Sequence, residues 1–506
     1  MPRSVPSSAR SVVRSAAVRS AVVRVCALGL LLPLAACGGS GDGGTGGGDD
    51  VGAAGVGDPY FPKAGNGGYD VRHYALDLDW EPDGTDAPDG SGASDGTRGS
   101  DDPDGPVLSG SARLTARATR DLAAFHLDLD GMTVRRVTVD GRKASFTRDG
   151  QELVVRPAAR LVSGRTFEVT VAYAGRPKTL TDPDGSEEGW LRTADGAVAL
   201  GEPTGSMTWF PGSHHPSDKA AYDLTVTVPE GLTAVSNGEL RARRTSGGRT
   251  TFVWHTAEPM ATYLATLAVG RFTVTRSTTP DGLPVYVAAD PTQAAASRTA
   301  LARLPEVMAW AADRFGPYPF SSTGAIVERP GDSAYALETQ NRPVFPGAPT
   351  PDLLVHELAH QWFGDSVTPR TWRDMWLNEG FATYAEWLWT EDEGGPTAEE
   401  TFQELYAYGE DTYEDLWAFP PADPPGADDI SADPVYQRGA MVVHRIRRTV
   451  GDKAFLDLVR GWTAAHRHAN ASTGDFTAYV ERQAPDQDFG PLWRDWLYGE
   501  GKPDRP

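Results

Sequence analysis

Apolar and polar residues alternate along the first half of the chain, from Tyr69 to about Tyr286. A period of two residues places successive side chains on opposite faces of a β-strand. Asp-Gly and Asn-Gly pairs, which favour tight turns between antiparallel strands, separate such runs. We therefore predict an antiparallel β domain over residues 58–290. Its clearest predicted strands are YALDLDW (Tyr74–Trp80), FHLDLDGMTV (Phe125–Val134) and FEVTVAY (Phe167–Tyr173).

The pattern changes after Pro291, where apolar residues recur at steps of three and four. This spacing follows one face of an α-helix. It predicts helices over Arg298–Gly316, which ends at a glycine, and over Leu377–Asp392. Residues 291–506 are therefore predicted to form a mainly helical second domain, and the fold class is multidomain α+β.

An acidic segment interrupts the predicted β domain at residues 81–106, which hold eight acidic residues and one arginine. The segment lacks the spacing of an EF-hand, so a disordered loop between two strands is favoured over a calcium-binding loop. The whole chain has 506 residues and a formal net charge of −22. Because it has no basic surplus to displace the counterions of phosphate groups, nucleic acid is excluded as a predicted partner.

The N-terminus has the parts of a bacterial export signal. Five arginines and no acidic residue occupy positions 1–24, and a run of ten residues follows, Val25–Leu34. Ten residues are too few to span a bilayer, but this length is typical of the apolar centre of a signal peptide. The next motif, LAAC, resembles the lipobox of bacterial lipoproteins, in which the cysteine is lipidated and becomes the new N-terminus. That cysteine is Cys37.

These features predict a lipoprotein signal peptide over residues 1–36, followed by lipidated Cys37 and a flexible tether to residue 57. The expected location is the extracytoplasmic face of the cell membrane, with the lipid on Cys37 as the anchor. The alternative is an ordinary secretory signal in which the cysteine occurs by chance. Eleven glycines in residues 38–57 favour the lipoprotein.

Two histidines lie four residues apart in VHELAHQWFGD, Val355–Asp365. The Thr-Pro-Asp sequence at residues 350–352 is typical of the start of a helix. On that helix His356 and His360 lie one turn apart on the same face, where neutral imidazoles suit Zn²⁺. Glu357, beside the first histidine, is placed to take a proton from a water molecule at the metal.

A catalytic zinc needs a third protein ligand and an open position. The metzincin pattern requires a glycine at position 363 and a histidine at position 366, where this chain has phenylalanine and serine. The other common solution is a glutamate on a following helix. Glu379 is such a glutamate, and eighteen residues separate it from His360. We therefore predict one Zn²⁺ per chain, held by His356, His360 and Glu379.

With HELAH followed after eighteen residues by NEGFATY, the sequence resembles the aminopeptidase N family of zinc metallopeptidases, which includes leukotriene hydrolase-type enzymes. The similarity covers residues 58–500. The resemblance implies a saddle-like β domain followed by a thermolysin-like catalytic domain. Many members add a large C-terminal helical domain, and we expect this chain to be a short bacterial member without it. Other similar segments are WFPGSHHPSDKA (Trp209–Ala220), GPYPF (Gly316–Phe320) and VYQRGAMVVH (Val435–His444).

The resemblance also implies roles for single residues. Glu357 is the expected general base, and Tyr436, in YQRG, is the expected hydrogen-bond donor to the oxyanion. In the family's G-A-M-E-N strand a glutamate binds the free amine of the substrate. YALET supplies Glu338 there, with tyrosine and threonine in place of the glycine and the asparagine. A second amine-binding glutamate is expected in the loop GEPTGSMTWFP, which offers Glu202.

The resemblance therefore implies a zinc-dependent aminopeptidase that removes N-terminal residues from peptides with a free N-terminus. Two alternatives stay open. One is an endopeptidase or epoxide hydrolase of the same fold, because the G-A-M-E-N strand is altered. The other is a non-catalytic binding lipoprotein. All the expected ligands, the base and the tyrosine are present, which favours an enzyme.

Overall fold

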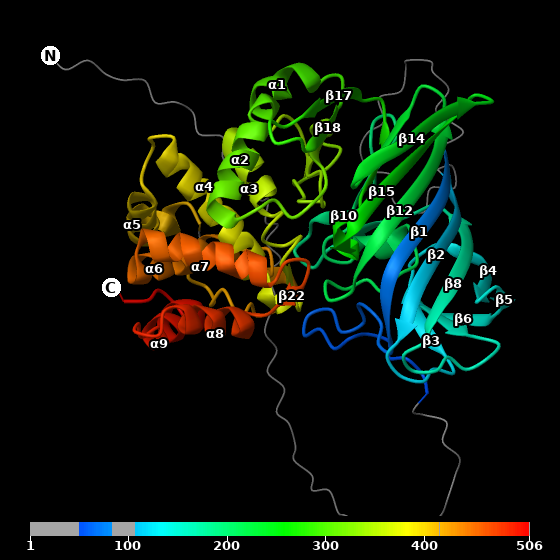
Figure 1. Ribbon diagram of the computed structural model, residues 1–506, viewed down its shortest axis with the longest axis horizontal. Coiled ribbons are helices and arrows are strands. Elements are labelled where there is room, and N and C mark those ends of the chain that lie inside the picture. The colour runs from blue at the N-terminus through cyan, green and yellow to red at the C-terminus, as the bar shows by residue number, and fades with distance from the viewer. Residues whose placement is uncertain (1–49, 83–106, 414, 505–506) are drawn as a thin grey trace, which may run out of the picture. The chain divides into compact units, whose positions relative to one another are not determined.

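The computed structural model describes residues 50–82, 107–413 and 415–504 of the chain. The predicted signal peptide, Cys37 and most of the tether lie outside the described residues, as do residues 83–106 of the acidic insert. Strands make up the first part of the described chain and helices most of the second (Figure 1), so the predicted α+β fold class is confirmed. Within these ranges, no helix combines the length and the apolar character needed to cross a membrane.

The first domain is built on a sheet of eight strands, most of which are seen side by side in Figure 1. Buried and more exposed side chains alternate along its strands, as the sequence predicts. Neighbouring strands are antiparallel except for β1 and β12, which are parallel with Leu76 opposite Leu224. In sheet order the strands are β14 (Glu239–Ser246), β15 (Arg249–Ala261), β12 (Lys219–Pro229), β1 (Tyr69–Glu81), β2 (Val107–Ala118), β8 (Thr166–Gly175), β4 (Thr133–Val139) and β5 (Arg142–Lys143).

The predicted strand Phe125–Val134 is two strands that belong to different sheets. The chain turns at Gly131, whose φ of 80° suits a residue without a side chain. As a result β3 pairs with β7 whereas β4 pairs with β8. The smaller sheets of this domain are β3 (Phe125–Asp128), β7 (Glu152–Arg156) and β6 (Ser145–Asp149), and then β13 (Thr233–Ser236), β16 (Leu267–Gly270), β11 (Ala197–Leu200), β10 (Glu187–Arg192) and β9 (Thr179–Thr181).

The predicted domain boundary at residues 290–291 is too late in the chain. Strand β18 (Pro284–Ala289) pairs in parallel with β19 (Thr323–Val327), which pairs in parallel with β20 (Val344–Phe345). Strand β17 (Thr273–Thr278) adds to the same sheet at β18. The second domain therefore begins with a small mixed sheet near Thr273. Both β17 and β18 fall inside the region predicted as β, but the sequence pattern could not show which sheet they join.

The helices of the second domain follow this sheet. The predicted helix Arg298–Gly316 is broken at Arg303, because Pro305 begins a new helix there. Gly316 ends that second helix, as predicted. A short parallel pair, β21 (Thr368–Pro369) and β22 (Asn470–Ala471), joins distant loops. The helices are α1 (Ala294–Ala302), α2 (Leu304–Phe315), α3 (Pro351–Ala359), α4 (Trp376–Asp392), α5 (Ala398–Tyr408), α6 (Gly439–Val450), α7 (Asp452–Ala465), α8 (Thr473–Gln483) and α9 (Gly490–Leu492).

The end of the predicted tether is part of the fold. Val51 forms a bridge with Ala124, and the backbone N–H of Gly52 donates to the carbonyl of Ala124 at 2.9 Å. Asp58, also buried, accepts hydrogen bonds from the backbone N–H of Trp372 at 2.9 Å and from the His215 ring at 3.1 Å. The folded chain therefore begins before Asp58. Glycine-rich composition indicates a flexible chain, but it does not reveal these backbone pairings.

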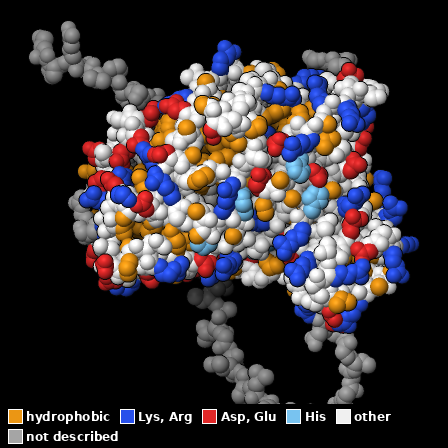
Figure 2. Space-filling model, in the orientation of Figure 1, with side chains coloured by type: hydrophobic (Ala, Val, Ile, Leu, Met, Phe, Trp, Pro, Cys, Tyr) orange, Lys and Arg blue, Asp and Glu red, His pale blue; other side chains and the backbone are white. Residues whose placement is uncertain are grey.

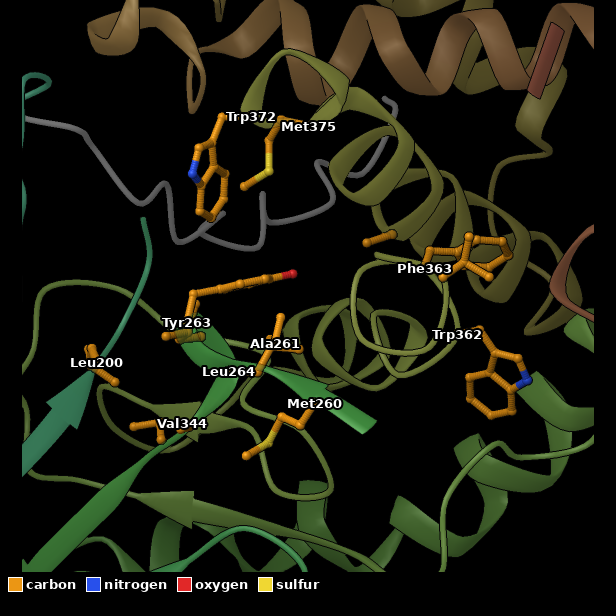
Figure 3. Packing of buried hydrophobic residues seen from close by; sticks show 14 of the residues in the cluster. Leu200, Met260, Ala261, Tyr263, Leu264, Val344, Trp362, Phe363, Trp372 and Met375 are labelled. Atoms are coloured by element: carbon orange, nitrogen blue, oxygen red, sulfur yellow. The ribbon is translucent and has the colours of Figure 1, made fainter. Parts of the chain in front are cut away.

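Acidic and basic side chains are interspersed on the face of the molecule shown in Figure 2. Beneath the surface, aromatic side chains from the two domains meet. The rings of Tyr263, which follows β15, and Trp372, which precedes α4, pack edge to face with their centroids 5.2 Å apart. Figure 3 shows the ring of Tyr263 lying below that of Trp372. This contact packs the second domain against the segment that follows β15.

Candidate active site

Helix α3 positions the two histidines of the HELAH motif. As the sequence predicts, Thr350 caps its N-terminus, and its hydroxyl accepts a hydrogen bond from the backbone N–H of Leu353 at 3.2 Å. His356 lies in the last turn and His360 at the C-cap, so both rings extend from one side of the helix. Both histidines are buried. A short, firmly capped helix therefore presents two imidazoles to the same point.

Glu379 reaches that point from the first turn of α4. Its Oε2 atom lies 3.2 Å from His356 Nε2 and 3.4 Å from His360 Nε2. A tetrahedral ion bound at about 2.0–2.1 Å has ligand atoms about 3.3–3.4 Å apart. The Glu379 oxygen is therefore as far from each imidazole nitrogen as a zinc ion requires, and these residues could hold a metal.

The outer nitrogens of both rings also have partners. His356 Nδ1 donates to Glu386 Oε1 at 2.6 Å, and His360 Nδ1 donates to the carbonyl of Phe363 at 3.0 Å. Such bonds fix the ring orientation and leave Nε2 free for a metal. Glu386 was not among the residues predicted from the sequence. Its position, seven residues after Glu379, puts it on the same face of α4 two turns later, which is a signal that could have found it.

The charges of the site act on one another. Burial lowers the pKa of His360, but the charges of Glu379 and Glu338 outweigh it, and the pKa rises to about 9. Burial raises the pKa of Glu379, but the two histidines, His360 foremost, hold it at about 2. Burial also raises the pKa of Glu357, to about 8. Glu357 Oε2 has no hydrogen-bond partner among the described residues, so this carboxyl is available to a substrate or water.

Two glycines bring Tyr436 to the site. A side chain on Gly380, next to Glu379, would lie within 3.0 Å of the backbone of Gly439, so α4 and α6 cross with their backbones in contact. Tyr436 lies three residues before Gly439, in the π-helical stretch Pro434–Arg438. Its ring is nearly parallel to that of His356, with centroids 6.2 Å apart and an interplanar angle of 10°. Short π-helical stretches of this kind are frequent at functional sites.

Glu202 and Glu338 come together beside the third metal donor. One oxygen each of Glu202, Glu338 and Glu379 lie within 4.8 Å of one another. Burial and the charges of Glu338 and Glu379 raise the pKa of Glu202 well above its usual range. Burial also raises the pKa of Glu338. Two carboxylates from segments far apart in the sequence thus form one wall of the site.

Supporting residues hold these two glutamates in place. Gln361, after α3, donates from Nε2 to the backbone carbonyl of Glu338 at 3.2 Å. Glu188 on β10 accepts hydrogen bonds from the backbone N–H of Thr204 at 2.9 Å, from the Thr204 hydroxyl at 2.7 Å and from the N–H of Gly205 at 2.7 Å. Glu188 therefore fixes the loop that follows Glu202. Neither supporting residue was found from the sequence, because the contacts join distant segments.

Two charged residues close to the motifs act on the backbone instead. Arg438, beside Tyr436, is buried and donates to the carbonyls of Trp496 at 3.0 Å and Phe419 at 3.2 Å. Asp374 caps the turn before α4 and accepts from the N–H of Thr473 at 2.8 Å. These contacts fasten the C-terminal part of the chain to the elements that carry Glu379 and Tyr436.

This fold and this set of donors define the class of zinc metallopeptidases, and two family models agree. The Peptidase M1 N-terminal domain matches residues 73–264, and the Peptidase family M1 domain matches residues 334–496. A crystal structure of an M1 zinc metallopeptidase mutant from Deinococcus radiodurans is 30% identical, with a TM-score of 0.75, and the match covers 89% of this chain and 99% of that one. The chain belongs to the M1 family of zinc metallopeptidases, as its motifs indicated.

A further structure and two curated relatives are also similar to this chain. A structure of the Deinococcus radiodurans enzyme with a Tyr-Ser-Ala substrate has 29% identity and a TM-score of 0.78, covering 89% and 99% of the two chains. Leucyl aminopeptidase of Saccharolobus solfataricus is 25% identical over 74% of this chain and 50% of its own length. Aminopeptidase M1 of Arabidopsis thaliana is 27% identical over 61% and 37%, respectively. The chain thus spans half or less of these two curated relatives.

Proposed function

We propose that the protein is a zinc-dependent aminopeptidase that removes single residues from the free N-terminus of peptides. The observation that carries this proposal is the position of Glu202 and Glu338 beside Glu379. A site for peptide hydrolysis alone needs the metal donors and a base. Two further carboxylates next to them suit a substrate that brings a positive charge, and the α-ammonium group is such a charge.

His356, His360 and Glu379 would hold the zinc ion, because their donor atoms have the required spacing. When bound, Zn²⁺ supplies a Lewis acid to the scissile carbonyl and lowers the pKa of a water molecule. Glu357 takes the proton of that water and later delivers it to the leaving amine. Its Oε2 atom has no hydrogen-bond partner among the described residues, so it can accept this proton and pass it on.

Tyr436 acts on the oxyanion that forms when water adds to the carbonyl. Burial, with the charge of Glu379, holds its pKa well above the usual range, so the hydroxyl keeps its proton and can donate it in a hydrogen bond. Such a donor strengthens as charge develops on the oxygen. Glu202 and Glu338 bind the α-ammonium group of the same residue whose carbonyl reacts. Because they lie beside Glu379, they place the first peptide bond of the substrate at the metal donors.

The test compares matched peptides that differ only in an N-terminal acetyl group. The wild type should cleave the free-amine peptide and leave the acetylated one nearly intact. Glu338→Ala should lower kcat/KM for the free-amine peptide by at least about 100-fold, because it removes a buried charge partner worth several kcal/mol. It should change the slow cleavage of the acetylated peptide little. Equal cleavage of both peptides by the wild type would make the protein an endopeptidase.

We also propose that the enzyme is attached to the extracytoplasmic face of a bacterial cell membrane through lipid on Cys37. The arginine-rich start, the short apolar run and the LAAC motif support this proposal. Cells supplied with labelled palmitate should incorporate it into the wild type. Cys37→Ala should abolish both the label and the partition into detergent, while Cys26→Ala should leave both unchanged. Labelling that survives Cys37→Ala would contradict the anchor.

A further inference from the structure

Glu379 lies between two clusters of ligand atoms. One cluster joins it to His356 and His360, and the other joins it to Glu202 and Glu338. Its Oε2 atom faces both histidines. Hydrolases with two metal ions hold them about 3.5–4 Å apart, and a carboxylate that belongs to both clusters is suited to link such a pair. The carboxylate wall of this site therefore has the arrangement of a second cation site next to the zinc site.

The second cluster also has unsatisfied oxygens. Glu338 is 3% exposed, and its Oε1 atom has no hydrogen-bond partner among the described residues. Oε2 of Glu202 also has no hydrogen-bond partner within the part of the chain that the structure describes. A buried carboxylate oxygen without a partner is costly. The cluster thus favours any cation that can reach all three oxygens.

Charge distinguishes the cations that could do so. An α-ammonium group brings one positive charge to the three oxygens of the second cluster, whereas a divalent cation brings two. The donors of the second cluster are all oxygens, which hard ions such as Mn²⁺, Mg²⁺ and Ca²⁺ prefer.

We propose that, when no substrate is bound, a second divalent cation occupies the space between Glu202, Glu338 and Glu379. It competes there with the ammonium group of the substrate. An excess of such an ion then inhibits by raising KM for free-amine peptides while kcat stays the same. The competition rests on the proposed aminopeptidase function, whereas the binding of the ion does not.

Binding is measured on the zinc-loaded full chain with Mn²⁺ as the probe. Electron paramagnetic resonance of free Mn²⁺ gives the amount bound, and mass spectrometry of the dialysed protein gives its zinc content. Acidic side chains are exposed on the molecular surface (Figure 2), so weak binding elsewhere is expected. The double variant Glu202→Gln/Glu338→Gln keeps those surface sites, and its binding curve is subtracted. The expected difference is one Mn²⁺ per chain, with one zinc ion retained.

Single variants assign the ion to the cluster. Glu202→Gln and Glu338→Gln should each weaken the specific Mn²⁺ binding by at least about tenfold, since even outer partners of a metal change affinity by 10- to 100-fold. Glu187→Gln, an exposed acid on β10, should leave it unchanged. Retained zinc content and an unchanged circular dichroism spectrum show that each variant is folded. Specific binding that is equal in the wild type and both single variants, or Mn²⁺ uptake that releases zinc, overturns the proposal.

Kinetics then test the competition. Mn²⁺ should raise KM for the free-amine peptide and leave kcat unchanged, and the inhibition should weaken in Glu202→Gln. Inhibition that lowers kcat alone overturns the competitive site. The two hypotheses fail in different measurements. A protein without a second ion but with a strict preference for free amines keeps the aminopeptidase function and loses this site. A protein that binds the ion but cleaves both peptides equally keeps the site and loses the function.

Discussion

Glu357 separates metal binding from turnover at the scale of single residues. It lies in the motif between the two histidines, yet its carboxylate is not one of the three converging donors. Glu357→Gln keeps the size of the side chain but cannot accept a proton. We expect it to lower kcat by at least about 100-fold, the lower end of what general-base catalysis contributes. Zinc content should stay at one ion per chain.

The matched control for this prediction is His360→Ala, which removes a donor atom and should lose both zinc and turnover. Activity is measured with an aminoacyl chromogenic amide, and zinc by mass spectrometry of the dialysed proteins. If Glu357→Gln kept nearly full activity, another group would have to be the base. If it lost zinc, the glutamate would be a ligand.

At the scale of elements, strand β10 supports the loop that follows Glu202. Strand β10 carries Glu188, which is completely buried and binds three donors of Thr204 and Gly205. Glu188→Ala leaves these donors unpaired and lets the loop move. Because small displacements at a site cost much activity, we expect KM for the free-amine peptide to rise about tenfold while kcat changes little.

Three comparisons show whether Glu188 acts through Glu202. Glu187→Ala, its exposed neighbour on the same strand, should have no effect on KM. Glu188→Gln, which keeps one acceptor oxygen, should restore part of the affinity. The acetylated peptide should be cleaved as slowly by Glu188→Ala as by the wild type. A fall in kcat for both peptides together would indicate a general loss of structure instead.

The elements also show what the sequence could and could not predict. The spacing of His356, His360 and Glu379 depends on two helices with clear start signals or apolar stripes. The local sequence pattern was therefore sufficient to predict these three residues as metal ligands. The pairing of Glu202 with Glu338 depends on a fold that joins residues 136 positions apart, and only the family resemblance indicated it. Glu188 and Gln361 matter through backbone contacts across elements, for which a single sequence has no periodic signal.

The boundaries were the least accurate part of the prediction for a similar reason. Strands β17 and β18 lie at the end of the region predicted as β, but they pair with each other and, through β18, with β19 of the second domain. The chain from residue 50 pairs with Ala124 through backbone atoms, which composition cannot reveal. The period of apolar residues along the chain shows whether a segment is a strand or a helix. Which elements it pairs with is set by the packing of the whole fold.

At the scale of the whole molecule, Lys219 is one of the side chains that join the two domains next to the metal site. It begins β12, and its ammonium group donates to the carbonyls of Asp365 at 2.8 Å and Ser366 at 3.0 Å and to the hydroxyl of Thr368 at 2.7 Å. Three donors thus meet three acceptors. The loop that they hold follows α3 and also carries the Phe363 carbonyl that orients His360.

Lys219→Met keeps the apolar stem and removes the donors, which leaves buried oxygens without partners. We expect the free energy of unfolding to fall by about 3 kcal/mol, since each unsatisfied buried group costs about 1–3 kcal/mol and the loop can relax in part. Zinc should also bind about tenfold more weakly, because the orientation of His360 is loosened.

The control for this prediction is Lys178→Met. Its partner Asp130 lies 3.0 Å away in a pair that is about one-third exposed, so the substitution should lower the free energy of unfolding by less than about 1 kcal/mol. Urea unfolding of the zinc-loaded proteins and competition with a zinc-binding dye measure the two effects. If Lys219→Met unfolded at the same urea concentration as Lys178→Met, the contact would not stabilise the joint between the domains.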